Sequence, residues 1–389
     1  MNFHKVQAYL DSLEGRYNLS AADCKVMQGH QVIFRHMWGY SDYSHSVPVT
    51  ENDLYDVYSC TKVITATAVM QAVEQGLLQL DDPVDKYLPS FSQMQVSEDY
   101  VPFQFPMKWP TLKDRVHAAP SKITVRQLLT MTSGLSYDLD SETVKKVIKE
   151  SDGQAGTVDI VNAMGKMPLL FDPGTRYSYS LGHDVAAAVI EVASGKRYEQ
   201  FLQENIFSPL KLKDMYLHVP DSEQRRLSAQ YGGVYGSNEI KKMDIGNRYR
   251  LTPQYDSGGA GLACTVDDYS KVLDALACGG VAYNGYHILM QESIEQIRTP
   301  QLNPQAQQDF SRSGKVGYGY GLGVRVLTDS SKSKSPVGEF GWDGAAGAYA
   351  LVDPKNHLSV FYAQEVLGMP KSYNEIHPTL RDLIYEALE

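Results

Sequence analysis

The sequence predicts an α/β protein of the α+β type, in which an antiparallel sheet flanked by helices is built from both chain ends. Strand-like runs occur early, in CKVMQG and QVIFRHMWG, and again late, in GLGVRVL, VGEFGW, GAYALVDP and HLSVFYAQ. The late strands have hairpin-like spacing, which favours antiparallel pairing because a parallel pair needs a long crossover. Helical patterns dominate between the two groups. We therefore expect a sheet domain of residues 1–80 plus 255–389, with a mainly helical domain of residues 81–254 inserted into it.

The elements follow one another in a readable order. The first residues, MNFHKVQAYLDSLEGRYNL, have the pattern of an amphipathic helix. Two strands follow, joined by a tight turn at Gly29 and His30. Residues 60–75 form a helix that is apolar nearly all round and ends before Gly76, which predicts a buried central position. Further helical runs are TVRQLLTMTSG, ETVKKVIKES, TVDIVNAMGK, LGHDVAAAVIEVASG, RYEQFLQENIFSPL and, at the end, HPTLRDLIYEAL.

Two long polar or proline-rich stretches, residues 92–120 and 219–254, interrupt the helical region. Neither stretch has a low-complexity composition. Long loops inside a compact domain are often functional. We therefore interpret both stretches as loops that border a cleft and shape a pocket.

Composition and charge limit the classes of function. The 389 residues are 43% hydrophobic and 21% charged, as in an ordinary globular protein. The net charge of −10 argues against nucleic acid as a partner, and no apolar run approaches the roughly 20 residues of a membrane span. The four cysteines lack CxxC spacing, which predicts neither a disulfide scaffold nor a metal site. The N-terminus lacks a signal-peptide pattern, so we expect a cytoplasmic location.

The first candidate for chemistry is Ser59-x-x-Lys62. The spacing alone is weak evidence, because Ser208–Lys211 and Ser331–Lys334 match it too. Only Ser59 begins the apolar helix, where free backbone N–H groups and the helix dipole can stabilise an oxyanion. Lys62 would be buried one turn further along the same face, and desolvation would lower its pKa towards that of a general base. The alternative is an N-cap serine followed by a solvated lysine.

Two further motifs supply possible partners. In PGTRYSYSL, Tyr179 could relay a proton between the serine and a leaving group, although most tyrosines only pack. In GWDGAAG, residues 341–347, the glycines would let a substrate approach the backbone, and one N–H could complete an oxyanion hole with that of Ser59. The alternative for this second motif is a tight bend at a sheet edge.

The ordered set of motifs resembles the class C β-lactamase and penicillin-binding-protein-like serine hydrolases. LLTMTSGLSYD, SGGAGLACTVDDYSKV, YGYGLGVRV and GWDGAAGAYALVDP have counterparts there in the same order, and the resemblance covers most of residues 20–365. It implies a β-lactamase/transpeptidase-like fold, Ser59 as nucleophile, Lys62 as base and Tyr179 as proton shuttle. It also implies that the Ser59 and Ala345 backbone N–H groups form the oxyanion hole, without any metal or cofactor.

Departures from the family pattern narrow the expected substrate. Leu181 stands where penicillin-recognising members have asparagine, and Trp342 and Asp343 replace their cation and hydroxyl. We expect Leu181, Trp342, Asp343 and Gly344 to bind substrate, with Trp342 as an apolar wall and Asp343 repelling carboxylates. Tyr-Ser-Leu with Trp-x-Gly resembles the family VIII carboxylesterases and related acyltransferases.

The sequence therefore predicts a serine hydrolase that forms an acyl-enzyme at Ser59 and acts on a small-molecule ester or amide, foremost a neutral, fairly apolar ester. Three alternatives stay open. They are a β-lactamase or D-Ala-type peptidase, an acyltransferase, and a non-catalytic binding or sensor protein on the same scaffold. No motif specifies an oligomeric state.

Overall fold

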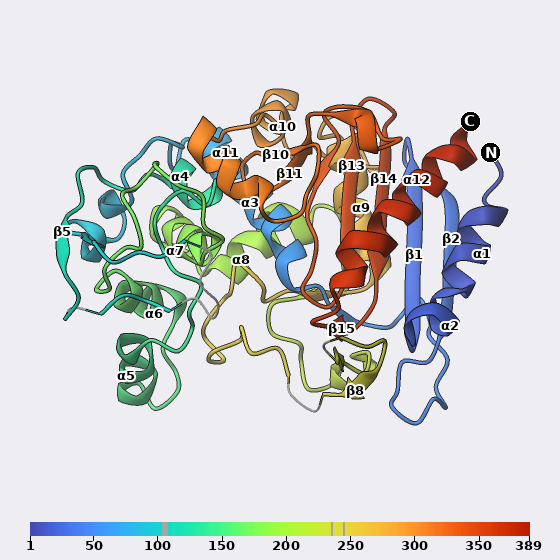
Figure 1. Cartoon of the computed structure of the whole chain (residues 1–389), viewed down its shortest axis with the longest axis horizontal. Coiled ribbons are helices and arrows are strands. Elements are labelled where there is room, and N and C mark those ends of the chain that lie inside the picture. The colour runs from blue at the N-terminus through green and yellow to red at the C-terminus, as the bar shows by residue number, and fades with distance from the viewer. Residues whose placement is uncertain (103–107, 112, 235, 244–245) are drawn as a thin grey trace.

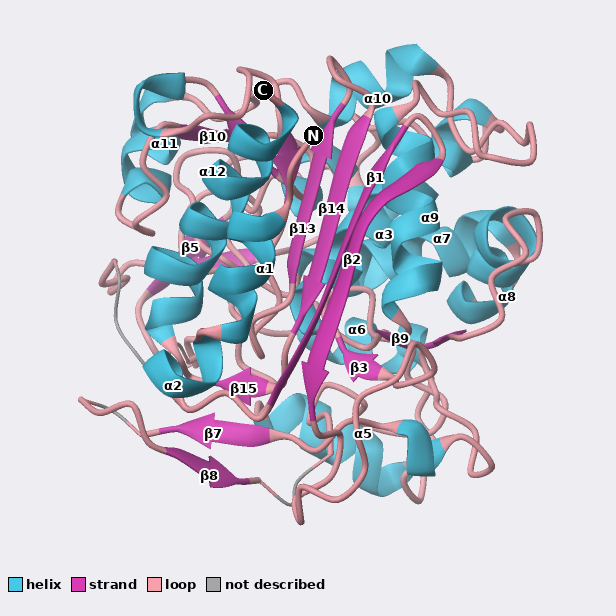
Figure 2. Ribbon diagram, turned by 90° about the vertical axis from the view of Figure 1, so that its right-hand side faces the viewer, coloured by secondary structure: helices cyan, strands magenta, loops and turns pink. Residues whose placement is uncertain are grey.

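The largest sheet joins strands from both ends of the chain (Figures 1 and 2). The computed structural model describes residues 1–102, 108–111, 113–234, 236–243 and 246–389. Within them, seven strands pair antiparallel in the order β10-β11-β12-β13-β14-β1-β2. They are β1 (Ala21–Gln28), β2 (Gln31–Gly39), β10 (Tyr318–Tyr320), β11 (Arg325–Leu327), β12 (Phe340–Gly341), β13 (Tyr349–Asp353) and β14 (Leu358–Ala363).

The pairing of β1 with β14 closes the sheet across the sequence. Cys24 lies opposite Tyr362, and Val26 lies opposite Val360. On its other side β1 forms a hairpin with β2, and Gly29 and His30 in the turn both have positive φ, at 54° and 68°. Positive φ at both turn residues matches the right-handed twist of a hairpin. The predicted turn and the predicted antiparallel sheet from both chain ends are confirmed.

Helices cover both faces of this sheet (Figure 2). Leu358, Val360 and Tyr362 of β14 face a core shared with α1 (His4–Asp11) and α12 (His377–Leu388). The alternate residues Phe361 and Ala363 face the main core, which includes α3 (Thr61–Glu74) and α9 (Val266–Ala277). Because successive strand residues point to opposite faces, burial on both sides gives a continuous apolar run rather than an alternating one.

Five helices from the middle of the chain gather on the side of α3 away from the sheet, around α7 (Figure 1). They are α4 (Val125–Leu129), α5 (Glu142–Glu150), α6 (Thr157–Met164), α7 (Gly182–Ser194) and α8 (Tyr198–Leu202), and all match predicted helical runs. In α3 the residues from Thr61 to Ala72 are buried, as its all-round apolar pattern predicts. The division into residues 1–80 plus 255–389 and residues 81–254 stays a prediction.

Several elements differ from the expectation. The amphipathic N-terminal segment is broken into α1 and α2 (Leu13–Tyr17), and α9, α10 (Gln291–Ile297) and α11 (Pro304–Ser311) were not foreseen. Short strands form three small sheets, two of which include parts of the expected loops: β4 (Gln95–Ser97), β5 (Val116–Ala118), β3 (Tyr55–Asp56), β6 (Met215–Tyr216), β9 (Ala263–Cys264), β7 (Tyr231–Gly233), β8 (Ile240–Lys242) and β15 (Val366–Leu367).

The two expected loops are only partly described. Of residues 92–120 and 219–254, positions 103–107, 112, 235 and 244–245 lie outside the described residues. Among all the residues that the structure describes, no helix is both long and apolar enough to cross a bilayer.

Candidate active site

The turn that carries Ser59 is held in an unusual backbone conformation. Ser59 lies in a short 3₁₀ turn, η1 (Tyr58–Cys60), which runs directly into α3. Tyr58 has φ of 42°, a left-handed value that costs a non-glycine residue on the order of 1 kcal/mol. Its hydroxyl donates to Gln230 Oε1 at 2.9 Å. Its ring packs edge to face with the Tyr249 ring, with 6.1 Å between the ring centres. These contacts hold the strained turn and place Ser59 at the start of the buried helix.

Lys62 lies fully buried beside the serine. Its Nζ donates to Ser59 Oγ at 3.2 Å and to the Gly259 carbonyl at 2.7 Å. Burial lowers the pKa of Lys62 to about 7, while the charge of Asp184 acts to raise it. A lysine with this pKa exists in both the charged and the neutral form near pH 7, as a general base requires.

Tyr179 and Trp342 complete the immediate surroundings of the pair. The Trp342 indole N–H donates to the Tyr179 hydroxyl at 3.1 Å, and the two rings stack at 5.8 Å. Lys62 Nζ lies 4.7 Å from the centre of the Tyr179 ring. Burial raises the pKa of Tyr179, and hydrogen bonds with Ser59 and Trp342 act in the opposite direction. The structure therefore brings Ser59, Lys62, Tyr179 and Trp342 together, with Tyr179 as a neutral phenol.

The segment from Gly344 to Gly347 packs directly behind the serine turn. A Cβ at Gly344 would lie 2.4 Å from the Val57 carbonyl oxygen, so only glycine permits this approach. The Tyr373 hydroxyl is 3.0 Å from the Gly344 carbonyl and 2.9 Å from the Ala345 carbonyl. The sequence interpretation assigned the glycines to the approach of a substrate. At Gly344 it is the protein's own backbone that comes close, and this contact holds the residue before Ala345 against Val57, two residues before Ser59.

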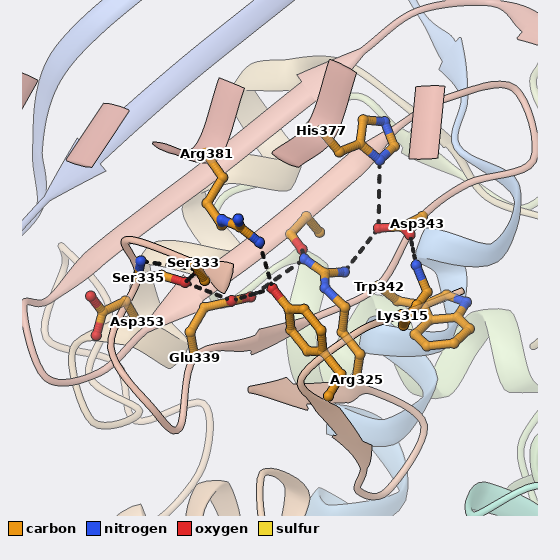
Figure 3. A network of polar contacts seen from close by, with 12 residues as sticks. Lys315, Arg325, Ser333, Ser335, Glu339, Trp342, Asp343, Asp353, His377 and Arg381 are labelled. Carbon is orange, nitrogen blue, oxygen red and sulfur yellow. Dashed lines mark hydrogen bonds and ion pairs between the residues drawn. The ribbon is translucent and has the colours of Figure 1, made fainter. Parts of the chain in front are cut away.

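Asp343 lies in a buried network of ion pairs (Figure 3). It pairs with Lys315 and with Arg325 Nη1, the latter at 2.9 Å, and His377 Nδ1 lies 3.8 Å away. Burial acts to raise the pKa of Asp343, but Lys315 and Arg325 outweigh it and hold that pKa well below its usual range. We therefore correct the expectation that Asp343 repels substrate carboxylates, because two cations, Lys315 and Arg325, compensate its charge.

Two other sequence interpretations have different outcomes. Leu181 is fully buried in the main core at the start of α7, and its expected contact with substrate stays a prediction. Cys60 is a buried packing residue, as expected, with its Sγ 3.5 Å from the Trp342 carbonyl. The competing pairs Ser208–Lys211 and Ser331–Lys334 are exposed, which confirms that context and not spacing distinguishes Ser59.

The predicted loop of residues 219–254 does reach the nucleophile turn. Gln230 and Tyr249 are its contacts with Tyr58. Tyr249 also lies 5.7 Å from Tyr137, whose ring lies 5.1 Å from that of Tyr179. The tyrosines 58, 137, 179 and 249 thus form an aromatic group around Ser59 and Lys62. Sequence reasoning missed Tyr137 and Tyr249, since their place emerges only when separate segments fold together.

Two groups of side chains elsewhere have metal-ligand chemistry. His30, Asp274 and Cys278 form one, and Glu199, His218 and Asp256 form the other, with ligand atoms within 4.8 Å of one another. In each group the central carboxylate already has partners. Asp274 contacts His30 at 2.7 Å, while Asp256 contacts Arg197 at 2.6 Å and His218 at 2.9 Å. These contacts within the protein account for both groups, and sequence spacing could not reveal the first one because His30 lies 244 residues from Asp274.

A buried Ser-Lys pair beside a neutral tyrosine, on a helix packed under an antiparallel sheet, is typical of serine hydrolases that use lysine in place of histidine. The chain belongs to the Beta-lactamase family, whose model matches residues 6–382. It is a serine hydrolase with a β-lactamase/transpeptidase-like fold. Family membership confirms the resemblance found in the sequence.

Individual relatives include esterases. The chain is 29% identical to the lovastatin esterase of Penicillium rubens, over 80% of this chain and 79% of that protein. It is 27% identical to esterase EstB of Burkholderia gladioli, over 98% and 94%. The solved structure of EstCE1, "a hydrolase with promiscuous acyltransferase activity", superimposes with a TM-score of 0.78 at 22% identity and covers 98% of this chain and 97% of EstCE1.

Proposed function

We propose that this protein is a carboxylesterase that forms an acyl-enzyme at Ser59 and acts on neutral, fairly apolar esters. The observation that carries the proposal is the contact between Ser59 Oγ and the buried Lys62 amine, whose pKa is about 7. A serine hydroxyl is a weak nucleophile unless an adjacent base removes its proton. Lys62 is placed to do so at neutral pH.

The proposed reaction has two steps. Lys62 takes the Ser59 proton while Oγ attacks the ester carbonyl carbon, and the N–H groups of Ser59 and Ala345 stabilise the oxyanion. Tyr179, hydrogen-bonded with Ser59, relays the proton to the leaving alcohol as the carbon–oxygen bond breaks. Water then attacks the acyl-enzyme in the same manner, the proton returns to Ser59 Oγ, and the acid is released.

The preference for apolar esters rests on the surroundings of the serine. The rings of Trp342, Tyr137 and Tyr179 lie around the Ser59–Lys62 pair. Gly344, packed on Val57, contributes by fixing this wall rather than by touching substrate. Aromatic faces favour apolar acyl groups because burying apolar surface contributes roughly 25 cal/mol per Å². The esterases among the relatives support the same reaction class.

Transfer to an alcohol acceptor is a second candidate. EstCE1, which has this fold, is a hydrolase with promiscuous acyltransferase activity. An acyl-enzyme that can be attacked by water can also be attacked by an alcohol bound in the same place. Addition of butanol during ester turnover would then form a butyl ester and accelerate release of the acyl group. Turnover that yields only the free acid at every butanol concentration would exclude acyl transfer to this alcohol, and hydrolysis would remain as the reaction.

The test of the proposed function is Ser59→Ala with p-nitrophenyl butyrate as substrate. We expect the variant to lose at least about 10³-fold in kcat, because the nucleophile is gone. Ser208→Ala is the matched control, since its serine has the same spacing to a lysine but is exposed. Mass spectrometry of the quenched wild type should show one butyryl group on the peptide that contains Ser59. Wild-type turnover by Ser59→Ala would refute the assignment.

A further inference from the structure

The loop of residues 257–259 is wedged between the helix that carries Lys62 and α7. From α3, Thr65 Oγ1 donates to the Gly258 carbonyl at 2.6 Å, and Lys62 Nζ donates to the Gly259 carbonyl at 2.7 Å. On the opposite side, a Cβ at Gly258 would lie 2.5 Å from the His183 carbonyl of α7. The loop therefore has one place in which it fits, and that place determines where the Gly259 carbonyl meets Lys62.

Asp184, in the first turn of α7, is the anchor of this loop. Its Oδ1 accepts hydrogen bonds from Ser257 Oγ at 2.7 Å and from the Tyr255 hydroxyl at 2.8 Å. Its carboxylate also accepts a hydrogen bond from the Gly259 backbone, and a Cβ at Gly259 would lie 2.4 Å from Oδ2. One side chain thus binds both ends of the segment whose carbonyl contacts Lys62.

Asp184 is also the carboxylate whose charge acts on Lys62. It is almost completely buried, and its charge opposes the effect of desolvation on the lysine. Burial raises the pKa of Asp184 itself, while Ser257, Lys62, Tyr255 and Gly259 act to lower it. The titratable groups that face the two residues from the packed elements are His183 on α7, Tyr137, Tyr179, Tyr198, Tyr255 and Cys60.

We propose that Asp184 is a positioning residue for Lys62: it fixes the Gly259 carbonyl against the lysine and supplies the buried negative charge that stabilises the lysine cation. This inference rests on the proposed function, in which Lys62 is the base. When the Ser59 proton moves to Lys62, a neutral amine becomes an ammonium ion in a buried site. A preorganised carbonyl and a nearby carboxylate stabilise that charge without reorganisation.

The test is Asp184→Asn, which keeps the shape of the side chain but removes its charge. Lys62 is followed directly by NMR in protein labelled with ¹³C and ¹⁵N at lysine, so the readout does not depend on catalysis. We expect the pKa of Lys62 to fall further, by about one pH unit. In ester hydrolysis, the acidic limb of the pH profile should move down by the same amount, and the plateau kcat should fall about tenfold or more.

Asp256→Asn is the matched control for charge. Asp256 is fully buried one residue before Ser257, but it pairs with Arg197 and His218. This variant should leave the pKa of Lys62 where it is in the wild type. Ser257→Ala tests the anchor alone, because it retains the Asp184 charge and removes one donor. It should lower kcat several-fold while KM and the acidic limb stay in place.

Each outcome tests either the electrostatic role or the positioning role of Asp184. An unchanged Lys62 pKa in Asp184→Asn, or an equal fall in Asp256→Asn, would overturn the electrostatic role. If Asp184→Asn does not fold, wild-type kcat in Ser257→Ala overturns the positioning role, and a several-fold loss supports it. None of these results tests the proposed esterase function itself. That function is tested by whether Ser59→Ala still hydrolyses the ester.

Discussion

Two regions of this molecule bury cationic side chains, and they treat the charge in opposite ways. Lys62 lies fully buried with neutral partners in direct contact, the Ser59 hydroxyl and the Gly259 carbonyl. Lys315 and Arg325 lie around Asp343 in a network of opposite charges (Figure 3). Burial lowers the pKa of Lys62 to about 7, whereas in the network it is the acid whose pKa is held low by its cations.

The contrast shows how burial produces either reactivity or rigidity. A buried charge without a contacting counter-charge gives up or takes up a proton easily, because desolvation has removed the preference for the ionised form. A buried charge with compensating partners keeps its ionisation, and removing one partner is expensive. The two regions meet at Trp342, which contacts Tyr179 and precedes Asp343 in the chain.

The difference between the two regions is tested most directly by removing one lysine from each of them. Lys62→Ala should lower kcat for p-nitrophenyl butyrate by about 10³-fold or more, because the base for Ser59 is lost. Lys315→Ala should lower it less than about tenfold, since Lys315 pairs with Asp343 and lies 5.4 Å from the centre of the Trp342 ring but is not the base in the proposed reaction. Steady-state kinetics of both variants at pH 8 measures the difference. Equal losses would mean that the two regions are not chemically distinct.

The second prediction concerns stability. Asp343→Ala leaves Lys315 and Arg325 without their shared partner, and breaking a buried ion pair costs about 3 kcal/mol. Urea denaturation should show this loss in the free energy of unfolding. Asp382→Ala is the control, because that carboxylate also pairs with an arginine, Arg381, but is partly exposed. A loss no larger than in this control would contradict the structural role of the network.

The third prediction concerns Tyr179. Tyr179→Phe keeps the ring that stacks on Trp342 but removes the hydroxyl that contacts Ser59 and the indole. We expect kcat to fall about 10²-fold with little change in the free energy of unfolding, because proton relay is lost while packing is kept. Tyr320→Phe is a suitable comparison, since Tyr320 also packs on Trp342 but its hydroxyl is buried without a hydrogen-bond partner among the described residues.

The smallest predicted effect is that of pH on the wild type. Lys62 acts as a base only when neutral, so activity should rise with pH through the pKa of about 7. Lowering the pH from 8 to 7 should therefore about halve kcat/KM. The profile is recorded with an ester whose own hydrolysis is subtracted at each pH. A profile that falls as pH rises over this range would exclude a lysine base.

Much of the fold and the centre of the site could be predicted from the sequence. The all-round apolar pattern located α3, and with it the burial of Lys62. Local patterns could not show that Asp343 meets Lys315 and Arg325, because those partners lie 28 and 18 residues away. The same limit applies to Asp184 and Gly259. The substrate role of Leu181 was carried over from the family motif, and local patterns could not show that its side chain is fully buried in the core.

The order of strands in the main sheet has a consequence for how the chain acquires its structure. β1 lies between β2 and β14, so its second neighbour is synthesised more than 300 residues after it. During translation the β1–β2 hairpin therefore emerges with one edge open and one face uncovered. Unpaired edges and uncovered apolar faces promote aggregation of nascent chains. The helix that carries Lys62 can pack beneath a complete sheet only when β13 and β14 have left the ribosome, so the early strands stay exposed through most of translation.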